Sequence, residues 1–215
     1  MGTISREGRF FFFDSESEPS EAIRLEFSRI KFFINSTIMT TNLNPQWIVG
    51  FCDGEACFNL DVHMLDSMRW KIQMQSEFTV VQHERDIQIL HALKDYFDCG
   101  SVIINRKDST STRWMWRVKN VKHLTQHIIP FFEKHQLKTK KKLEFLTFRK
   151  ISLKMNEGYH LESLENFLEI VDLGEELSQR GAKEKPKKLK RKKVDEQLEN
   201  LRAQLNQQTP NENEK

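Results

Sequence analysis

Apolar and polar residues alternate along four stretches of the chain, and this spacing predicts strands with one buried and one open face. The stretches run from Phe58 to Met64, from Trp70 to Val80, from Ser101 to Asn105 and from Arg113 to Lys119. Short turns join the first strand to the second and the third to the fourth. We therefore expect two pairs of antiparallel strands.

Apolar residues at helical spacing lie between and after these strands. This spacing predicts helices at residues 84–97, 121–135, 140–154 and 161–177, and a shorter helix that ends near Glu55 precedes the first strand. The order is helix, two strands, helix, two strands and further helices. It is typical of an α+β fold, in which helices pack on one face of a four-stranded antiparallel sheet.

The short helix before the first strand carries two glycines, Gly50 and Gly54, four residues apart on one face. Missing side chains there let a second backbone come close, so we expect Val49, Gly50, Asp53 and Gly54 to line a dimer interface. Glu55 and Asp53 add negative charge to a helix end that is already negative, which favours a bound cation. An ordinary packed helix or a turn is the alternative, because Gly-x-x-x-Gly alone is a weak signal.

The polar face of the four strands is rich in amide and basic side chains. Asn, Gln, Arg and Lys hydrogen-bond base edges in the major groove, and Arg and Lys also hold phosphates. A sheet laid in the major groove is one way to read bases, so this face is a candidate DNA-binding surface. The alternative is the ordinary solvated side of a half-exposed sheet. The candidates are Asn59, Asp61, His63, Lys71, Gln73, Gln75, Asn105, Arg113, Arg117 and Lys119.

Composition limits the class of protein. The 215 residues suit one domain of ordinary size plus tails. No apolar stretch approaches the ~20 residues that a membrane helix needs, so no membrane partner is expected. Cys52, Cys57 and Cys99 are odd in number and lack metal-ligand spacing. We interpret them as reduced thiols of an intracellular or organellar protein.

Charge and composition divide the chain into three expected regions. Residues 1–44 form a poorly ordered extension, in which Met39 is an alternative start that would leave residues 1–38 out of the mature protein. A domain follows at residues 45–180. Eight of the eleven residues from Lys183 to Lys193 are Lys or Arg. We therefore expect residues 181–215 to be a flexible basic and polar tail that attracts phosphates of any sequence.

The segment Ile48-Val49-Gly50-Phe51-Cys52-Asp53-Gly54-Glu55-Ala56 resembles the signature helix of the LAGLIDADG homing endonucleases. It departs from the family pattern in having Glu55 for the usual second Asp and Ala56 for the final Gly. The predicted order of elements from about residue 45 to about residue 175 is also similar to the LAGLIDADG fold, so the resemblance covers most of the chain.

The resemblance implies a site-specific endonuclease that cuts double-stranded DNA and promotes the mobility of a group I intron. One motif per chain implies a homodimer that reads a long, pseudo-palindromic target. The implied cofactor is Mg²⁺, with Mn²⁺ as a substitute. Similarity to endonucleases of green algal plastid introns implies an organelle-encoded chloroplast protein, with the mitochondrion as the alternative.

Site residues follow from the same resemblance. The Glu55 carboxylate and the Ala56 carbonyl would hold the metal, and Gln82 would orient solvent at the scissile phosphate. A helix-entry role for Gln82 remains an equal alternative. Arg85 is the nearest basic residue to the position where the family often carries one.

The segment Pro130–Lys140 is similar to the family segment that delivers a lysine to the active site. Lys138 is the corresponding residue, and Lys140 is a second basic group that can contact DNA. Lys141 and Lys142 are interpreted as a solvated helix start.

Two other functions remain open on the same fold. One is an RNA-binding maturase that assists splicing of its own intron, and the other is a non-catalytic nucleic-acid-binding protein. Retention of Glu55, Gln82 and Lys138 favours the enzyme.

Overall fold

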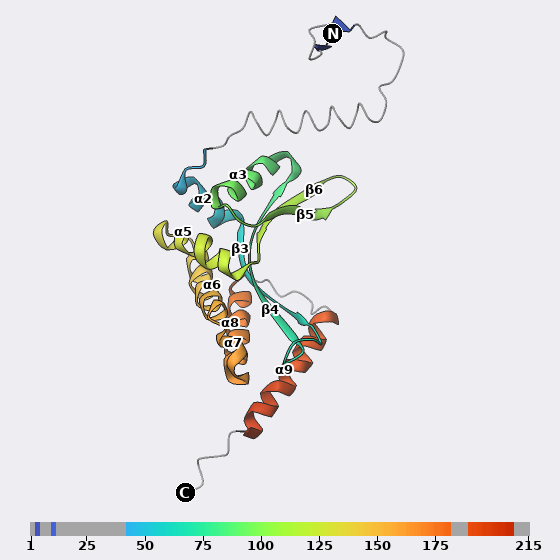
Figure 1. Cartoon of the computed structure of the whole chain (residues 1–215), viewed down its shortest axis with the longest axis vertical. Coiled ribbons are helices and arrows are strands. Elements are labelled where there is room, and N and C mark those ends of the chain that lie inside the picture. Colours follow the sequence, from blue (N-terminus) through green and yellow to red (C-terminus); the bar gives the residue numbers. More distant parts are fainter. Residues whose placement is uncertain (1–2, 5–9, 12–41, 182–188, 209–215) are drawn as a thin grey trace. The chain divides into compact units, whose positions relative to one another are not determined.

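The computed structural model describes residues 3–4, 10–11, 42–181 and 189–208 (Figure 1). The chain divides into two units, Met1–Thr40 and Thr41–Lys215. In the first unit, β1 (Thr3–Ile4) pairs with β2 (Phe10–Phe11) in antiparallel fashion. The prediction of a poorly ordered extension at residues 1–44 falls mostly on residues outside the described ones.

The second unit is built on a four-stranded antiparallel sheet, as predicted. Its strands are β3 (Ala56–Met64), β4 (Ile72–His83), β5 (Ser101–Lys107) and β6 (Thr112–Val118), in the order β3-β4-β6-β5. Strand β4 begins at Ile72 instead of Trp70. The reason is local: Lys71 has a φ of 59°, which belongs to a turn and not to a strand.

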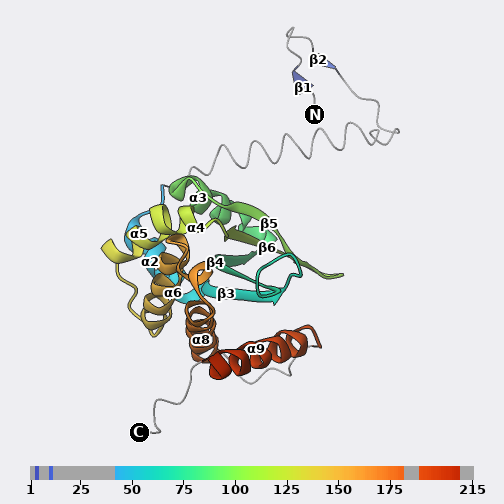
Figure 2. The ribbon, with the colours of Figure 1, turned by 60° about the horizontal axis from the view of Figure 1, so that its bottom comes forward.

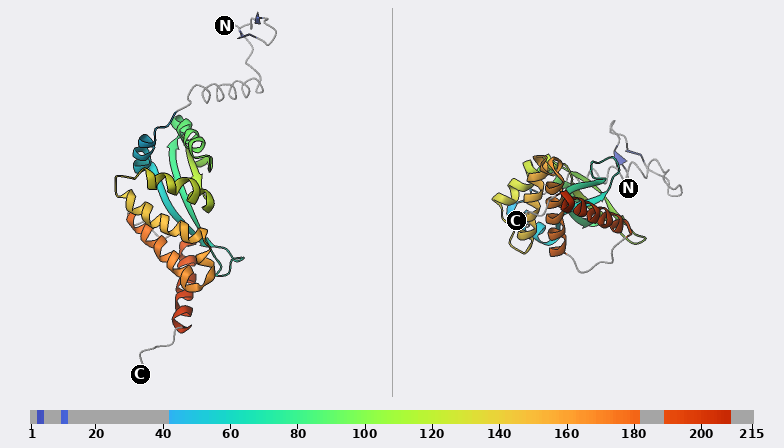
Figure 3. Two further views of the ribbon diagram at one scale, coloured as in Figure 1. Left: turned by 60° about the vertical axis from the view of Figure 1, so that its left-hand side comes forward. Right: turned by 90° about the horizontal axis from the view of Figure 1, so that it is seen from below.

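Helices cover one face of this sheet, which confirms the α+β architecture. Figure 3 shows helices α5 to α8 lying across the strands. The helical elements are α2 (Pro45–Glu55), η1 (Glu84–Asp86), α3 (Ile87–Phe97), α4 (Val121–His123), η2 (Leu124–Ile128), α5 (Ile129–Lys134), α6 (Lys141–Asn156), α7 (Tyr159–Glu162), α8 (Leu164–Gly181) and α9 (Leu189–Gln208). Among the described residues, no helix combines the length and the apolar character that crossing a lipid bilayer requires.

The core lies between the sheet and the helices and is rich in aromatic rings. The Phe58 ring of β3 lies 5.1 Å from the rings of both Phe78 and Phe148, centroid to centroid. The Trp116 ring is fully buried, and its Nε1 donates to the Cys99 carbonyl oxygen at 2.9 Å. This packing fixes one face of each strand to the helices and leaves the other face open.

Helix α9 corrects the prediction of a flexible tail over residues 181–215. Its side chains Val194, Leu198 and Leu201 are buried, and Gln197 Nε2 donates to the Trp70 carbonyl oxygen at 3.3 Å. The apolar residues recur every three to four positions and form a stripe that packs against α8 and β3. Figure 2 shows α9 beside α8 and the β3 edge of the sheet. Residues 182–188 and 209–215 of the predicted tail lie outside the described ones.

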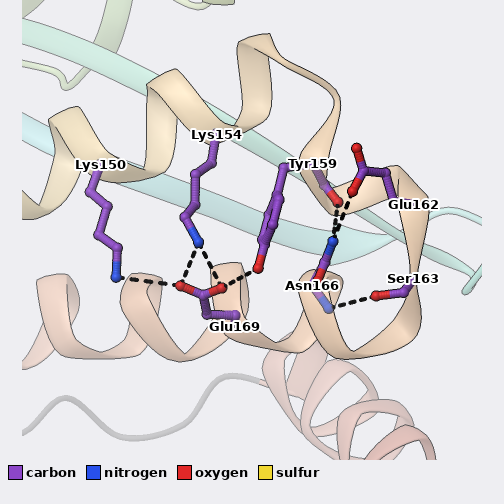
Figure 4. Close-up of polar contacts among 7 residues, drawn as sticks. All are labelled: Lys150, Lys154, Tyr159, Glu162, Ser163, Asn166 and Glu169. Atoms are coloured by element: carbon purple, nitrogen blue, oxygen red, sulfur yellow. Dashed lines mark hydrogen bonds and ion pairs between the residues drawn. The ribbon is translucent and has the colours of Figure 1, made fainter.

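A carboxylate joins α6, α7 and α8 (Figure 4). Both Glu169 oxygens lie 2.7 Å from Lys154 Nζ, and the Tyr159 hydroxyl donates to Oε2 at 2.7 Å. Lys150 Nζ lies 3.3 Å from Oε1. These donors, Lys154 above all and then Tyr159, lower the pKa of Glu169 to about 2. We call Lys150, Lys154, Tyr159 and Glu169 the clasp.

Candidate functional site

Helix α2 has one buried face and one open face. The Asn44 side chain caps its first turn by accepting from the Gln46 amide at 2.8 Å. Ile48, Val49 and Cys52 are buried in the core. On the other face, a Cβ built at Gly50 or Gly54 would meet nothing within 4 Å. The open face is thus bare backbone at these two positions, and bare backbone is the feature from which the sequence predicts close packing with a second helix.

Two residues of this helix change the predicted interface. Val49 is only 3% exposed, so its side chain belongs to the core of its own chain and not to the open face. Trp47 is 42% exposed and stacks on Phe51 with ring centroids 4.7 Å apart. The predicted interface did not include this pair, although Trp47, Gly50 and Gly54 recur at helical spacing.

Asp53 ties a distant loop to the end of α2. Its Oδ2 accepts from the Lys138 amide at 2.8 Å, and its Oδ1 accepts from the Thr139 amide at 3.3 Å and the Thr139 hydroxyl at 2.8 Å. These contacts satisfy the Asp53 carboxylate within its own chain, so the residue supports the helix end instead of only lining an interface. They also hold the backbone of Lys138 beside that end.

Glu55 and Ala56 form the junction between α2 and β3. The Glu55 side chain is exposed, and no hydrogen bond or ion pair joins its carboxylate to another described residue. The Ala56 carbonyl oxygen accepts from Lys141 Nζ at 2.5 Å, and the Lys141 side chain is only 16% exposed. Lys141 is therefore not the solvated residue that the sequence predicts: it places a positive charge beside the junction.

Strand register brings Gln82 to the same end of the sheet. Ala56 pairs with Val80, and Gln82 lies two residues further along β4, about 7 Å beyond that pair. Gln82 is half-buried and pairs with Trp114. His83 Nδ1 accepts from the Arg85 amide at 3.2 Å and caps η1. The Arg85 side chain is exposed.

The open face of the sheet carries most of the predicted polar residues in register. Asp61 pairs with Gln75, and His63 pairs with Gln73. The side chains that are half-buried or exposed on this face are Asn59, Asp61, His63, Gln73, Gln75, Arg113, Arg117 and Lys119. The acid Glu77 shares the face, and its Oε2 lies 3.7 Å from Lys119 Nζ.

Four predicted residues lie elsewhere than on a regular strand, and one of them, Lys119, directly follows the last residue of β6. Lys71 is in the turn before β4, and Lys140 is an exposed residue at the start of α6. Asn105 sits at a β-bulge, because Ile104 pairs with Trp114 whereas Arg106 pairs with Arg113. Arg106 therefore takes the place on the open face that simple alternation gives to Asn105. A bulge shifts the alternation by one residue, but Asn105, Arg106 and Lys107 are all polar, so the sequence did not reveal the shift.

The comparisons with known proteins agree with this geometry. The model of a family described as LAGLIDADG endonuclease matches residues 48–152. The homing endonuclease I-TnaI has a solved structure that is 36% identical, and the likeness covers 75% of this chain and 99% of that one, with a TM-score of 0.62. The chain belongs to the LAGLIDADG endonuclease family.

Other similar proteins are matched over only part of their length. "Probable intron-encoded endonuclease 2" of Neurospora crassa is 33% identical over 139 residues, which are 63% of this chain and 30% of that protein. "DNA endonuclease I-CeuI" of Chlamydomonas moewusii is 25% identical over 105 residues, 49% of this chain and 47% of that protein. The endonuclease I-LtrWI, solved bound to target DNA, is 26% identical with a TM-score of 0.58 over 63% of this chain and 44% of that one. This chain thus spans about a quarter to a half of the length of the curated relatives it matches, and several of those relatives are named as intron-encoded endonucleases.

Members of the LAGLIDADG family generally use a divalent metal, and the donors at the α2 end fit such an ion. Carboxylate and main-chain carbonyl oxygens are the ligands that Mg²⁺ accepts, together with water and substrate phosphate. The Ala56 carbonyl oxygen accepts from the Lys141 ammonium in this structure, so a metal bound through that oxygen would displace this side chain. Among the residues that the structure describes, no cluster of three or more His, Cys, Asp or Glu could hold a metal.

Two cysteines of this LAGLIDADG protein, Cys52 and Cys99, are buried core residues with no part in the proposed reaction. Burial raises the pKa of the Cys52 thiol to about 12 and that of the Cys99 thiol to about 11. Both thiols therefore stay protonated at neutral pH, and neither is a nucleophile.

Proposed function

We propose that this chain is a site-specific endonuclease that hydrolyses phosphodiester bonds in double-stranded DNA and promotes intron mobility. The observation that carries the proposal is the junction of α2 and β3. There the exposed Glu55 carboxylate stands beside a loop that Asp53 holds in place. A carboxylate without a partner among the described residues, one residue from a carbonyl that Lys141 contacts, suits a metal and a phosphate better than it suits folding.

Glu55 and the Ala56 carbonyl would hold the divalent ion, which we propose to be Mg²⁺, with Mn²⁺ as a substitute. When bound, the ion neutralises phosphate charge and lowers the pKa of an attacking water. Lys138, whose backbone amide donates to Asp53, is proposed to stabilise charge on the phosphate in the transition state. Gln82 is proposed to orient solvent, and Arg85 to pair with a phosphate.

The open face of the sheet is the proposed DNA-binding surface. It divides into two chemical halves: amide and acidic groups on β3 and β4, and the cations Arg106, Arg113 and Arg117 on β5 and β6. Amides suit base edges, whereas guanidinium groups also suit phosphates. Helix α9 adds two exposed lysines, Lys192 and Lys193, beyond the β3 edge.

We further propose that two chains pair through the open face of α2. Bare backbone at Gly50 and Gly54 lets two helices approach closely, and pairing supplies one Glu55 for each DNA strand. A two-fold dimer reads a pseudo-palindromic target. The chloroplast is the proposed location, on the resemblance to algal plastid enzymes.

The test is cleavage of a library of DNA duplexes with randomised cores, incubated with the full chain in Mg²⁺ or in EDTA. Sequencing of the cut ends should reveal double-strand breaks within one long motif, in Mg²⁺ only. Selective binding without cuts in Mg²⁺ or in EDTA would instead support a regulator. Binding to the RNA of its own intron in place of DNA would support a maturase.

A further inference from the structure

Three different helices hold the turn between β3 and β4. In α7, the Leu161 carbonyl oxygen accepts from Arg69 Nη1 at 3.0 Å. In α8, the Phe167 ring lies 4.6 Å from the Trp70 ring, centroid to centroid. In α9, Gln197 Nε2 donates to the Trp70 carbonyl oxygen at 3.3 Å, and Figure 1 shows α9 beside this turn. Two consecutive residues of the turn are therefore anchored to the helices.

The bond from α9 meets a need of the Trp70 backbone. Strand β4 begins only at Ile72, and Lys71 has a φ of 59°, so Trp70 lies outside the hydrogen-bonded ladder of the sheet. Trp70 is half-buried, and a backbone carbonyl that leaves water needs a new partner. Gln197 supplies the donor, because the burial of the next residue, Leu198, docks this part of α9.

The tip of the β5–β6 hairpin offers a contrast. Among the described residues, its hydrogen bonds stay within the hairpin: the Asp108 amide donates to the Ser111 carbonyl oxygen at 2.8 Å, and Arg106 Nε donates to Asp108 Oδ1 at 2.8 Å. A hairpin of this sheet thus forms without anchors to three helices. The anchors of the β3–β4 turn serve something other than the formation of a hairpin.

Two candidates for DNA contact adjoin the anchored residues. Lys71 follows Trp70 directly and is exposed, and Gln73 lies two residues further along, on the open face opposite His63. A side chain discriminates between base pairs only when its donors and acceptors are held in place by supporting contacts. A shift of the Trp70 backbone would move both neighbours.

We propose that α9 is a brace that fixes the β3–β4 turn and thereby sharpens base preference where Lys71 and Gln73 meet the DNA. Gln197 is a positioning residue, which acts through the Trp70 carbonyl and not by touching DNA. This role rests on the proposed DNA-binding function of the open face. It differs from the role of the α9 lysines, because attraction to phosphates is the same for every sequence.

The test is selection of bound duplexes from a library with randomised cores. Gln73→Ala and Arg117→Ala first identify the base pair that each residue reads. Gln197→Met keeps the length of the side chain and removes the donor, so discrimination at the Gln73 pair should fall about three- to tenfold. Discrimination at the Arg117 pair should stay the same, because Arg117 pairs with Thr79, about 20 Å along β4 from Gln73.

Further variants separate the brace from general stability. Gln204→Met changes an exposed glutamine of the same helix and should leave every preference unchanged. Leu198→Asp buries a charge and undocks α9, so it should lower discrimination at least as much as Gln197→Met. Hydrogen exchange gives a readout without DNA. The Met68 and Lys71 amides donate within the turn and should exchange faster in Gln197→Met than in Gln204→Met.

Each outcome decides. If the unaltered chain enriches no sequence, the proposed DNA function fails. If it enriches a site, but Gln197→Met keeps full discrimination at the Gln73 pair or loses it equally at the Arg117 pair, α9 is not a brace and the function stands. The same conclusion follows if Gln73→Ala changes no preference. A uniform loss of affinity with unchanged preferences would leave α9 as a phosphate-binding helix only.

Discussion

Two glutamates in this chain show opposite uses of a carboxylate. Glu169 lies between α6, α7 and α8, and Lys150, Lys154 and Tyr159 surround it with donors. Glu55 ends α2 on the surface, and no described side chain answers its charge. The first carboxylate is satisfied by the fold. The Glu55 carboxylate is available to a group from outside the described part of the chain.

The difference separates stability from chemistry. Removing Glu169 takes several hydrogen bonds from the folded state, whereas removing Glu55 takes none that the structure describes. The negative charge of Glu55 also destabilises the folded state slightly, because the helix dipole is already negative at the end of α2. We therefore expect removal of Glu169 to lower the free energy of unfolding and to spare cleavage. Removal of Glu55 should abolish cleavage and spare the free energy of unfolding.

The largest effect is expected from Glu55→Gln. The amide keeps the shape but loses the charge that holds a metal, so the cleavage rate in Mg²⁺ should fall by about 10³-fold or more. Binding to the selected duplex and the unfolding midpoint should change little. The matched control is Glu169→Gln, which should cut at close to the normal rate. A comparable loss of cleavage in both variants would remove the distinction between the two carboxylates.

The next effect concerns the open face beside Glu55. Because a Cβ at Gly54 meets nothing within its own chain, a larger side chain there should spare folding and block only a second copy. Sedimentation should show less dimer in Gly54→Ala and a monomer in Gly54→Leu. A dimeric Gly54→Leu variant that cuts normally would place the interface elsewhere.

A smaller effect, on stability, is expected from Glu169→Gln. Hydrogen bonds to a charged group that is about one-third exposed should contribute about 1–2 kcal/mol to the free energy of unfolding. Because the folded pKa of Glu169 is depressed to about 2, this contribution is complete above about pH 4.5 and is lost as the pH falls toward 2. Denaturant titrations of both proteins should differ at pH 7 and converge near pH 2. A constant gap at all pH values would mean that the charge is not the cause.

The smallest effect is expected from the basic start of α9. Lys192→Gln with Lys193→Gln should weaken binding to every duplex by a few-fold and reduce the slope of log K against log salt by about 1–2. Base preference should stay unchanged. Lys122→Gln with Lys134→Gln removes equal charge from α4 and α5 and is the control. If both pairs of substitutions lower the slope equally, the lysines of α9 do not contact DNA phosphates more than other surface lysines do.

The sequence predicted the sheet and its open face because alternation is a local signal, written in neighbours along β3, β4 and β6. The proposal of Glu55 as a metal ligand stays a prediction, and it was within reach of the sequence because the glycines that mark the helix lie within a few residues. The sequence missed Lys141, whose partner Ala56 is 85 residues away, and the clasp, whose partners are 10 to 19 residues from Glu169. Contacts at that separation depend on packing, which no local pattern records.

Helix α9 is a different kind of omission, because its signal was present. Val194, Leu198, Leu201 and Leu205 recur at helical spacing, but they stand among so many charged and amide residues that composition suggested a tail. Periodicity was the better guide there, since an amphipathic helix needs only one apolar stripe to dock.

The central claim is that the α2 end of each chain cuts one DNA strand. It is tested most directly by purified mixed dimers, in which one tagged chain carries Glu55→Gln and its partner is unaltered. On a supercoiled plasmid that contains the selected site, these dimers should nick one strand and yield open circles, with little linear DNA. Linear product at the rate of the unaltered dimer would contradict the claim, because Glu55 would then not be needed at each strand.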